Sequence, residues 1–146
     1  EKTPSQRSLF GRLYNCTMLT VSKKVEYSIV FISYLSHNKG KNITLTQVAK
    51  LLKLPYRFLG KIAINLKDGG IVESKEGKNG GYQLIKGWEK KSIYDLIESM
   101  GENKAIVTCL GDKNCLRIKD CKMKKIWEKI ERGWFLELKK IKLGEI

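Results

Sequence analysis

The chain of 146 residues is poor in histidine and proline, with one and two of them, and it lacks any long apolar run. A lone histidine supplies no nucleophile–base set, and no phosphate-binding glycine loop leads into Gly-Lys-Ser/Thr. No stretch reaches the roughly 18 apolar residues that a membrane-spanning helix needs. We therefore expect that the protein is not an enzyme and does not contact a membrane.

Acidic residues are scarce relative to basic ones. Lysine and arginine total 29 against 15 aspartates and glutamates, which gives a formal net charge of +14. A surface of this kind favours a polyanion such as nucleic acid. A generically basic protein without such a partner fits the charge equally well, so the choice between the two depends on motifs.

Three of the four cysteines, Cys109, Cys115 and Cys121, are separated by five residues each time. No signal peptide is visible, so we expect a cytoplasmic protein, and in that reducing compartment grouped cysteines are metal ligands or redox groups rather than disulfides. The residues between them are charged or turn-forming, which predicts a loop. Cys16 stands apart within residues 1–17, which lack periodicity and are interpreted as an N-terminal extension.

The spacing of the cysteines leaves the bound group open. Zinc sites usually contain cysteines only about two to four residues apart, so zinc is possible without being favoured. Iron–sulfur clusters take thiolates from a polar loop and need a fourth ligand, which three cysteines do not supply. Reduced thiols that act as sensors, with no metal, are a further interpretation.

Residues 18–91 predict a winged helix-turn-helix. Thr44 and Gln47 form a capping box that opens a short helix, and Leu54-Pro55 separates it from the next one. Two short alternating runs surround a glycine-rich turn and indicate a β-hairpin directly behind the helix pair. The expected elements are helices over 22–37, 44–52 and 55–68 and strands over 71–74 and 82–85.

Residues 92–146 predict a helix opening at Ser92, a cysteine loop over 101–122 and a long helix over 123–141. Large apolar residues recur along the long helix at intervals of three and four. Such a stripe is too large for a lone terminal helix to leave in water, so we expect that it packs against a partner surface. The residues of this predicted contact, which serve for dimerisation if the partner is a second copy, are Trp127, Ile130, Trp134, Leu138 and Ile141.

The helix over 55–68 carries Arg57, Lys61 and Asn65 at intervals of four, which places them on one face. These residue types pair with guanine and adenine edges in the major groove, and Lys75 and Lys78 of the hairpin can reach phosphates or the minor groove. Taken alone, the three helical residues fit an ordinary solvated face, and the hairpin lysines an ordinary exposed turn. The predicted DNA-contacting residues are Thr44, Tyr56, Arg57, Lys61, Asn65, Lys75 and Lys78.

Several stretches of the chain resemble one family. They are residues 19–22 and 25–28, the segments 56–62 and 66–72, Gly80-Gly81-Tyr82, the three cysteines and the ending 141–146. Together, from Met18 to Ile146, they resemble the Rrf-type winged-helix transcription regulators, which include IscR-, NsrR- and RsrR-like members. The resemblance implies a homodimer crossed through the C-terminal helix, a pseudo-palindromic operator in double-stranded DNA, and an iron–sulfur cluster, with [2Fe–2S] favoured over [4Fe–4S].

The resemblance also bears on the fourth ligand. IscR-like members place a histidine three residues beyond the last cysteine, where this chain has Lys124. NsrR- and RsrR-like members use a carboxylate of the first helix from the other subunit, and Glu26 occupies the matching position. The resemblance therefore implies Glu26 of the partner subunit as a ligand, although a first-turn glutamate stabilised by the helix dipole is the ordinary interpretation. His37 aligns with no family ligand, and Glu76 replaces a common wing arginine.

The expected protein is mainly α-helical with a small β-hairpin wing: a winged helix-turn-helix followed by a long C-terminal dimerisation helix. We expect an iron–sulfur-containing, sequence-specific regulator, acting as a repressor, that senses redox state, nitric oxide or iron–sulfur status. The alternative is a zinc- or thiol-based winged-helix module that binds a partner protein, because the fold alone does not determine the function.

Overall fold

The computed structural model describes residues 21–102, 105–107, 110 and 121–146. The chain divides into two compact units. One unit, which we call the head, comprises residues 21–103 and 135–146, and the other, the cysteine unit, comprises residues 1–20 and 104–134. Among the described residues, no helix is long and apolar enough to cross a membrane.

The head begins with helix α2 (Lys23–His37), whose N-terminus is capped by Ser22. The Val25 N–H donates to the Ser22 hydroxyl over 3.3 Å, which satisfies one of the unpaired donors of the first turn. Apolar residues at helical spacing put one face of α2 into the core, with Phe31 and Ile32 fully buried. The predicted first helix therefore forms where its periodicity indicated.

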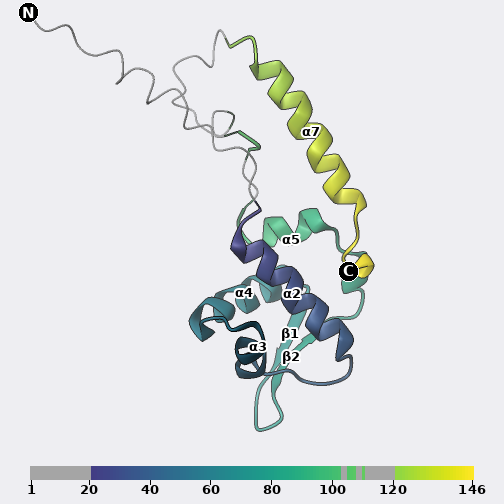
Figure 1. Cartoon of the computed structure of the whole chain (residues 1–146). Helices are drawn as coiled ribbons and strands as arrows, with labels where there is room; N and C mark the ends of the chain where they lie inside the picture. Colours follow the sequence, from purple (N-terminus) through teal and green to yellow (C-terminus); the bar gives the residue numbers. More distant parts are fainter. Residues whose placement is uncertain (1–20, 103–104, 108–109, 111–120) are drawn as a thin grey trace, which may run out of the picture. The chain divides into compact units, whose positions relative to one another are not determined.

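Helices α3 (Leu45–Leu52) and α4 (Tyr56–Asp68) form the helix-turn-helix (Figure 1). The predicted capping box is present, because the Gln47 N–H donates to Thr44 Oγ1 and the Thr44 N–H donates to Gln47 Oε1. Lys53 takes a left-handed conformation (φ 52°) that ends α3, and Pro55 occupies the N-cap position of α4, with no side-chain cap hydrogen bond. The tight turn between the helices thus has a local cause at both ends.

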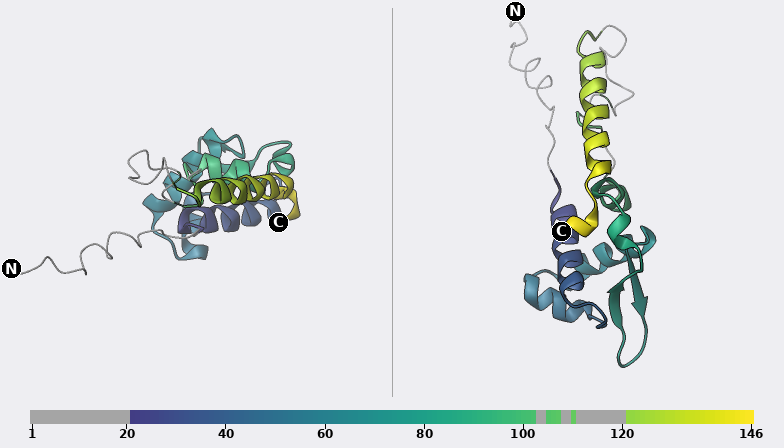
Figure 2. Two further views of the ribbon diagram at one scale, coloured as in Figure 1. Left: turned by 90° about the horizontal axis from the view of Figure 1, so that it is seen from above. Right: turned by 90° about the vertical axis from the view of Figure 1, so that its right-hand side faces the viewer.

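Strands β1 (Val72–Lys75) and β2 (Gly81–Leu84) pair antiparallel, with Val72 opposite Leu84 and Lys75 opposite Gly81. The hairpin is also attached to the segment before α3 through a bridge between Ile43 and Tyr82. At Gly81 (φ +154°) a Cβ atom would lie 2.8 Å from the Ile43 carbonyl, so this close approach requires glycine. The tip of the hairpin projects past α3 (Figures 1 and 2).

The 3₁₀ turn η1 (Trp88–Lys90) leads into α5 (Ile93–Ser99), which opens with a capping box between Ser92 and Asp95. Burial raises the pKa of Asp95, but the hydrogen bonds from the Ser92 N–H and hydroxyl, with two nearby lysines, outweigh it and keep the pKa below its usual value. Asp95 is therefore held as the anion that the start of a helix favours.

Helix α7 (Lys124–Lys140) begins in the cysteine unit and ends in the head, where the turn η2 (Leu143–Glu145) follows it. The Leu143 N–H donates to the Lys91 carbonyl over 2.8 Å, and Ser92 and Lys142 form a bridge. Leu143 itself is fully buried. The C-terminal segment is thus part of the head's fold.

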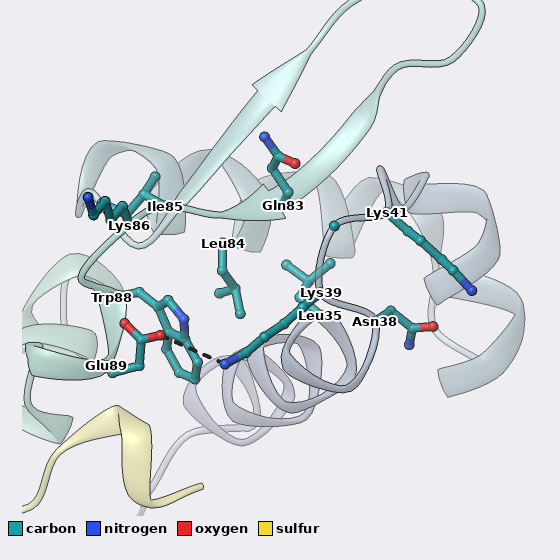
Figure 3. Close-up of a pocket in the computed structure, with 11 residues that line it drawn as sticks. Leu35, Asn38, Lys39, Lys41, Gln83, Leu84, Ile85, Lys86, Trp88 and Glu89 are labelled. Carbon is teal, nitrogen blue, oxygen red and sulfur yellow. Dashed lines mark ion pairs between the residues drawn. The ribbon is translucent and has the colours of Figure 1, made fainter.

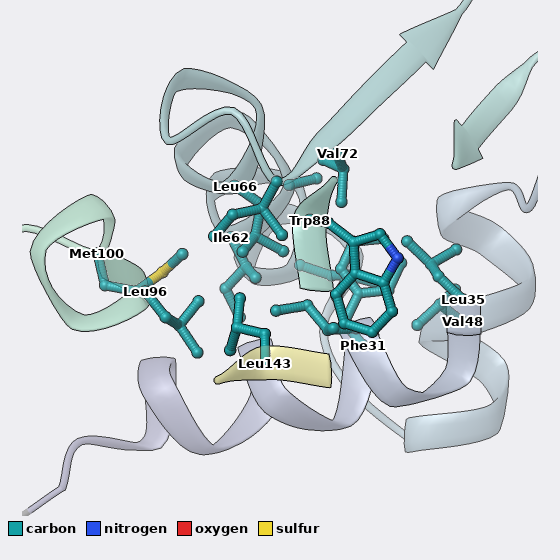
Figure 4. Close-up of a cluster of buried hydrophobic side chains, with 14 of the residues drawn as sticks. Phe31, Leu35, Val48, Ile62, Leu66, Val72, Trp88, Leu96, Met100 and Leu143 are labelled. Atoms are coloured by element: carbon teal, nitrogen blue, oxygen red, sulfur yellow. The ribbon is translucent and has the colours of Figure 1, made fainter. Parts of the chain in front are cut away.

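One apolar core joins all these elements of the head. Leu143 from the C-terminal segment enters the same cluster as Phe31 of α2, Ile62 of α4 and Leu96 of α5 (Figure 4). Each of these four side chains is fully buried. The predicted class, a mainly helical protein with a small β-hairpin wing, is confirmed.

Candidate nucleic-acid interface and cysteine segment

The solvent face of α4 is basic. Arg57 and Lys61 are exposed, and among the described residues neither has a carboxylate within ion-pair distance. Tyr56, at the start of the helix, has an exposed fraction of 57%. The opposite face of α4 packs into the core through Leu59 and Ile62, so the orientation of the basic face is fixed by burial.

Two other predicted DNA-contacting residues have partners within the head. Asn65 is half-buried, and its Nδ2 atom lies 3.9 Å from the Met100 sulfur, which turns the amide toward the end of α5. Thr44 is exposed, but its hydroxyl donates to Gln47 Oε1 over 3.0 Å within the capping box. Both roles in DNA contact remain predictions, and both residues also stabilise the fold.

The hairpin presents exposed Lys75 and Lys78 beside α4 and carries Glu76 at its turn. Two hydrogen bonds hold it in place: Lys67 Nζ donates to Ser74 Oγ over 2.9 Å, and Asn42 Nδ2 donates to the Asn79 carbonyl over 2.9 Å. The first of these bonds links the hairpin directly to α4, the helix that carries the basic face.

Ile64 is exposed by 57% and was not among the predicted contact residues. It follows Arg57 by seven residues and Lys61 by three, so it lies on the same side of α4. Gly60 lies one turn before it, and a Cβ atom added to Gly60 would meet nothing within 4 Å. The helical spacing from Arg57 was the sequence signal that could have found both residues.

A cavity of 290 Å³ opens between the end of α2, strand β2 and η1. Lys39 and Glu89 face each other across it at 3.9 Å, whereas Lys41 extends away from it (Figure 3). Trp88 lines it and is itself buried in the core. None of the predicted DNA-contacting residues lines this cavity, so it is a separate feature of the head.

Of the three evenly spaced cysteines, only Cys121 belongs to the described residues, and Cys109 and Cys115 lie outside them. Cys121 is a free, half-buried thiol directly before α7, and its carbonyl accepts the Lys124 N–H over 3.1 Å. Within the described ranges, no group of three or more His, Cys, Asp or Glu residues is arranged to hold a metal ion.

Glu26 lies in the first turn of α2 and is half-buried. Its Oε2 atom accepts a hydrogen bond from exposed Lys23 over 2.6 Å, and this bond raises the pKa of Lys23 above its usual value. A negative charge in the first turn of a helix is also stabilised by the helix dipole, so the position of Glu26 is explained without a ligand role. His37, at the far end of the helix, has its Nδ1 atom 2.7 Å from the Ser33 carbonyl.

The predicted dimerisation stripe on α7 is partly available for contact. Ile130 and Ile141 are exposed by 46% and 44%, and Trp134 by 38%. Trp127 is half-buried, and Leu138 is already buried within its own chain with 8% exposed. Exposed apolar residues that were not predicted extend the stripe toward the start of α7, namely Met123 and Ile126.

Met100, the C-cap of α5, connects the helices of the head at the point where the chain leaves toward the cysteines. Lys24 Nζ donates to its carbonyl over 2.5 Å. The Ser28 hydroxyl donates to the Lys24 carbonyl over 2.6 Å, and its oxygen lies 3.1 Å from the Met100 sulfur. The Asn65 amide of α4 reaches the same sulfur. We call these four residues the Met100 junction; they link α2 and α4 to the end of α5.

The helix pair, the hairpin and the basic face of α4 define a winged-helix DNA-binding protein. Residues 21–146 match the Rrf2 family, which is described as an iron-dependent transcriptional regulator, so the chain belongs to that family. It is a DNA-binding transcription regulator and not an enzyme, and the predicted family resemblance is confirmed.

Curated relatives include a putative HTH-type transcriptional regulator of Aquifex aeolicus, which is 34% identical over 89 residues, or 61% of this chain and 62% of that protein. Another, from Haemophilus influenzae, is 26% identical over 88% of this chain and 86% of the relative. NsrR of Shouchella clausii is 27% identical over 73% of each chain. All three relatives are named as transcriptional regulators, and each matches more than half of this chain.

Solved structures show the same fold. CymR, the global cysteine regulator of B. subtilis, superposes with a TM-score of 0.67 at 22% identity over 86% of this chain and 94% of that one. T. potens IscR superposes with a TM-score of 0.63 at 23% identity over 86% of this chain and 83% of that one. At these identities the likeness concerns the fold alone.

Proposed function

We propose that the protein is a sequence-specific repressor that binds a pseudo-palindromic operator as a homodimer and whose operator affinity depends on an iron–sulfur cluster. The observation that carries the proposal is the match of residues 21–146 to an iron-dependent regulator family in a chain with three evenly spaced cysteines. The proposed ligands are Cys109, Cys115, Cys121 and Glu26 of the partner subunit.

The DNA side of the proposal rests on charge and exposure. Arg57 and Lys61 lie exposed on α4, and Lys75 and Lys78 lie exposed on the hairpin that α4 holds through Lys67. Lysine and arginine contacts to phosphates release counterions and give salt-dependent affinity, whereas arginine on a base edge gives sequence choice. Arg57 is therefore the residue from which we expect specificity.

Two observations on the described residues support a bound cluster. Cys121 has a free thiol, and Lys122, Lys124 and Lys125 beside it in sequence provide positive charge for anionic ligands. Glu26 is half-buried, and its partner Lys23 is an exposed side chain that can be exchanged without loss of packing. When bound, an iron–sulfur cluster, with [2Fe–2S] favoured, supplies a centre that responds to redox state, nitric oxide or iron supply.

The Met100 junction gives this regulation a physical route. A displacement of the chain after Met100 acts directly on Lys24 and Ser28 of α2 and on Asn65 of α4. Packing between α5 and α4 is tight at the same place, since a Cβ atom at Gly69 would lie 2.5 Å from Ser99 Cβ. Packed elements of this kind shift between discrete arrangements, which is what a switch in operator affinity requires.

The alternative function is a zinc- or thiol-based winged-helix module that binds a partner protein. The observation that favours it is the Lys23–Glu26 ion pair, which already satisfies the glutamate within its own chain. Three thiolates with no carboxylate ligand suit zinc with a further ligand, or reversible thiol oxidation, as well as they suit iron.

Iron and sulfide content tests the proposal. We expect the full chain, purified without oxygen, to contain about two iron and two sulfide per chain, with visible absorption. Cys121→Ser is expected to lower both contents, and Glu26→Ala to change the spectrum and speed cluster loss. Lys23→Ala is the matched control, because it removes the ion pair and leaves the carboxylate, and it should keep the cluster.

Two outcomes would contradict the proposal. Bound zinc, or no metal, together with the absence of sulfide would favour the alternative. An unchanged spectrum and cluster lifetime in Glu26→Ala would remove Glu26 from the ligand set while leaving the cysteines in it.

A further inference from the structure

Gly60 lies in the interior of α4, where glycine destabilises a helix relative to alanine. A Cβ atom added there would meet nothing within 4 Å. The neighbouring glycines differ, because a Cβ atom at Gly69 would clash with Ser99 and one at Gly80 with the Lys75 carbonyl. The packing of the head therefore gives no reason for glycine at position 60.

Ile64 follows Gly60 by one helical turn on the same side of α4 and is exposed by 57%. Its neighbour Ile62 is fully buried, so the helix does not need Ile64 for its core. A single exposed isoleucine is unremarkable by itself. Here it lies one turn beyond the bare Gly60 backbone, on the same side of α4 as the exposed cations Arg57 and Lys61, which precede it.

The occupant of this face follows from charge and from the chemistry of the major groove. Arg57 and Lys61 select a polyanion, and an α-helix fits the major groove of DNA. The apolar group that base edges present in that groove is the C5-methyl of thymine. Ile64 is an exposed aliphatic side chain one turn beyond Gly60, where the space that a side chain would fill is open. We call this open position beside Ile64 the notch.

We infer that Gly60 and Ile64 form an apolar notch that receives the C5-methyl group of an operator thymine, so that both residues determine sequence specificity. Gly60 lets the helix backbone approach the base edge, and Ile64 covers the methyl group on one side. The inference rests on the proposed function. It goes further by naming one base of the operator, thymine, and the two residues that contact it.

Deoxyuridine substitution tests the contact, because it removes the methyl group and keeps every hydrogen-bonding group. A specific site is first selected with the full chain from random duplex DNA, and each thymine is then replaced singly. We expect one thymine per half-site at which replacement weakens binding about fourfold, the effect of one buried methyl-sized group. In Ile64→Ala the same replacement should have no further effect, which a double-mutant cycle measures directly.

Gly60→Ala separates recognition from folding. Because its added methyl group meets open space and alanine favours the helix, the variant should unfold at a higher temperature than the wild type. It should nevertheless bind the selected site at least about tenfold more weakly, because the methyl group occupies the notch. Leu136→Ala is the matched control for Ile64→Ala, since it truncates another exposed aliphatic residue, 54% exposed, on α7.

The outcomes are distinguishable. Recovery of no specific site would overturn the proposed function and the inference with it. Recovery of a specific site at which no uracil replacement matters, or matters equally in Ile64→Ala, would overturn the inference alone. Unchanged affinity of Gly60→Ala for the selected site would likewise exclude the notch.

Discussion

The head and the cysteine unit differ in what their apolar side chains contact. In the head, residues from the helices, the hairpin and the C-terminal segment, among them Phe31, Ile62 and Leu143, are fully buried in one cluster. In the cysteine unit, the start of α7 leaves Met123, Ile126 and Ile130 exposed by 46% to 49%. The head therefore completes its apolar core within one chain, whereas the exposed stripe on α7 can pack against a second chain.

This difference suggests that the two units have different functions. The head supplies the residues that read DNA, because the buried face of α4 fixes which of its side chains point outward. A segment that gains stability from a second copy, or from a bound group, responds to the presence of that copy or group. Regulation is therefore expected in the cysteine unit and recognition in the head.

The largest effect is expected from the C-terminal segment. Leu143→Ala should lower the free energy of unfolding by about 3 kcal/mol, because it removes a fully buried leucine and leaves a cavity in the head. Urea unfolding followed by circular dichroism measures it. Ile146→Ala, at a residue 38% exposed, is the control and should cost less than about 1 kcal/mol. Equal losses in both variants would show that the segment is not part of the head's core.

A smaller effect, on association alone, is expected from α7. Trp134→Glu places a charge on the exposed stripe and should raise the dimer dissociation constant at least about thirtyfold, or about 2 kcal/mol, with unfolding of the head unchanged. Sedimentation velocity over a concentration series measures it. Leu136→Glu is the control, because Leu136 is 54% exposed but lies about 200° around the helix from Trp134. Dissociation to the same extent in both variants would contradict the proposed interface.

Local signals in the sequence predicted most of the head. The Thr44–Gln47 capping box, the Ser92 cap and the hairpin around its glycine-rich turn all depend on residues close together in the chain, and all three form. The docking of Leu143 was not predicted, because its partner at Lys91 is more than 50 residues away and helical periodicity does not encode such contacts.

The candidate site was predicted less completely, for a geometrical reason. Steps of four residues drift around a helix, so Asn65 turns from the face of Arg57 toward Met100 and becomes half-buried. Leu138 likewise leaves the exposed stripe of α7 and is buried within the chain. Spacing identified the correct helices, but it did not distinguish the residues at the edge of a face.

The identity of the bound group could not be predicted from spacing, because iron–sulfur clusters, zinc and reactive thiols all use cysteine. Cys121 is a free thiol, which fits each of them, and Cys109 and Cys115 lie outside the described residues. The family that the chain matches is described as an iron-dependent regulator, which supports the iron–sulfur proposal, and chemical analysis of the purified protein identifies the bound group.

We propose that the cysteine unit controls how tightly the head binds DNA. The most direct test is the affinity of the full chain for its selected operator, measured without oxygen before and after iron is removed by a chelator, at one salt concentration. We expect the two dissociation constants to differ by at least about fivefold, the lower range for allosteric coupling. Equal affinities of an iron-containing and an iron-free sample would contradict the account.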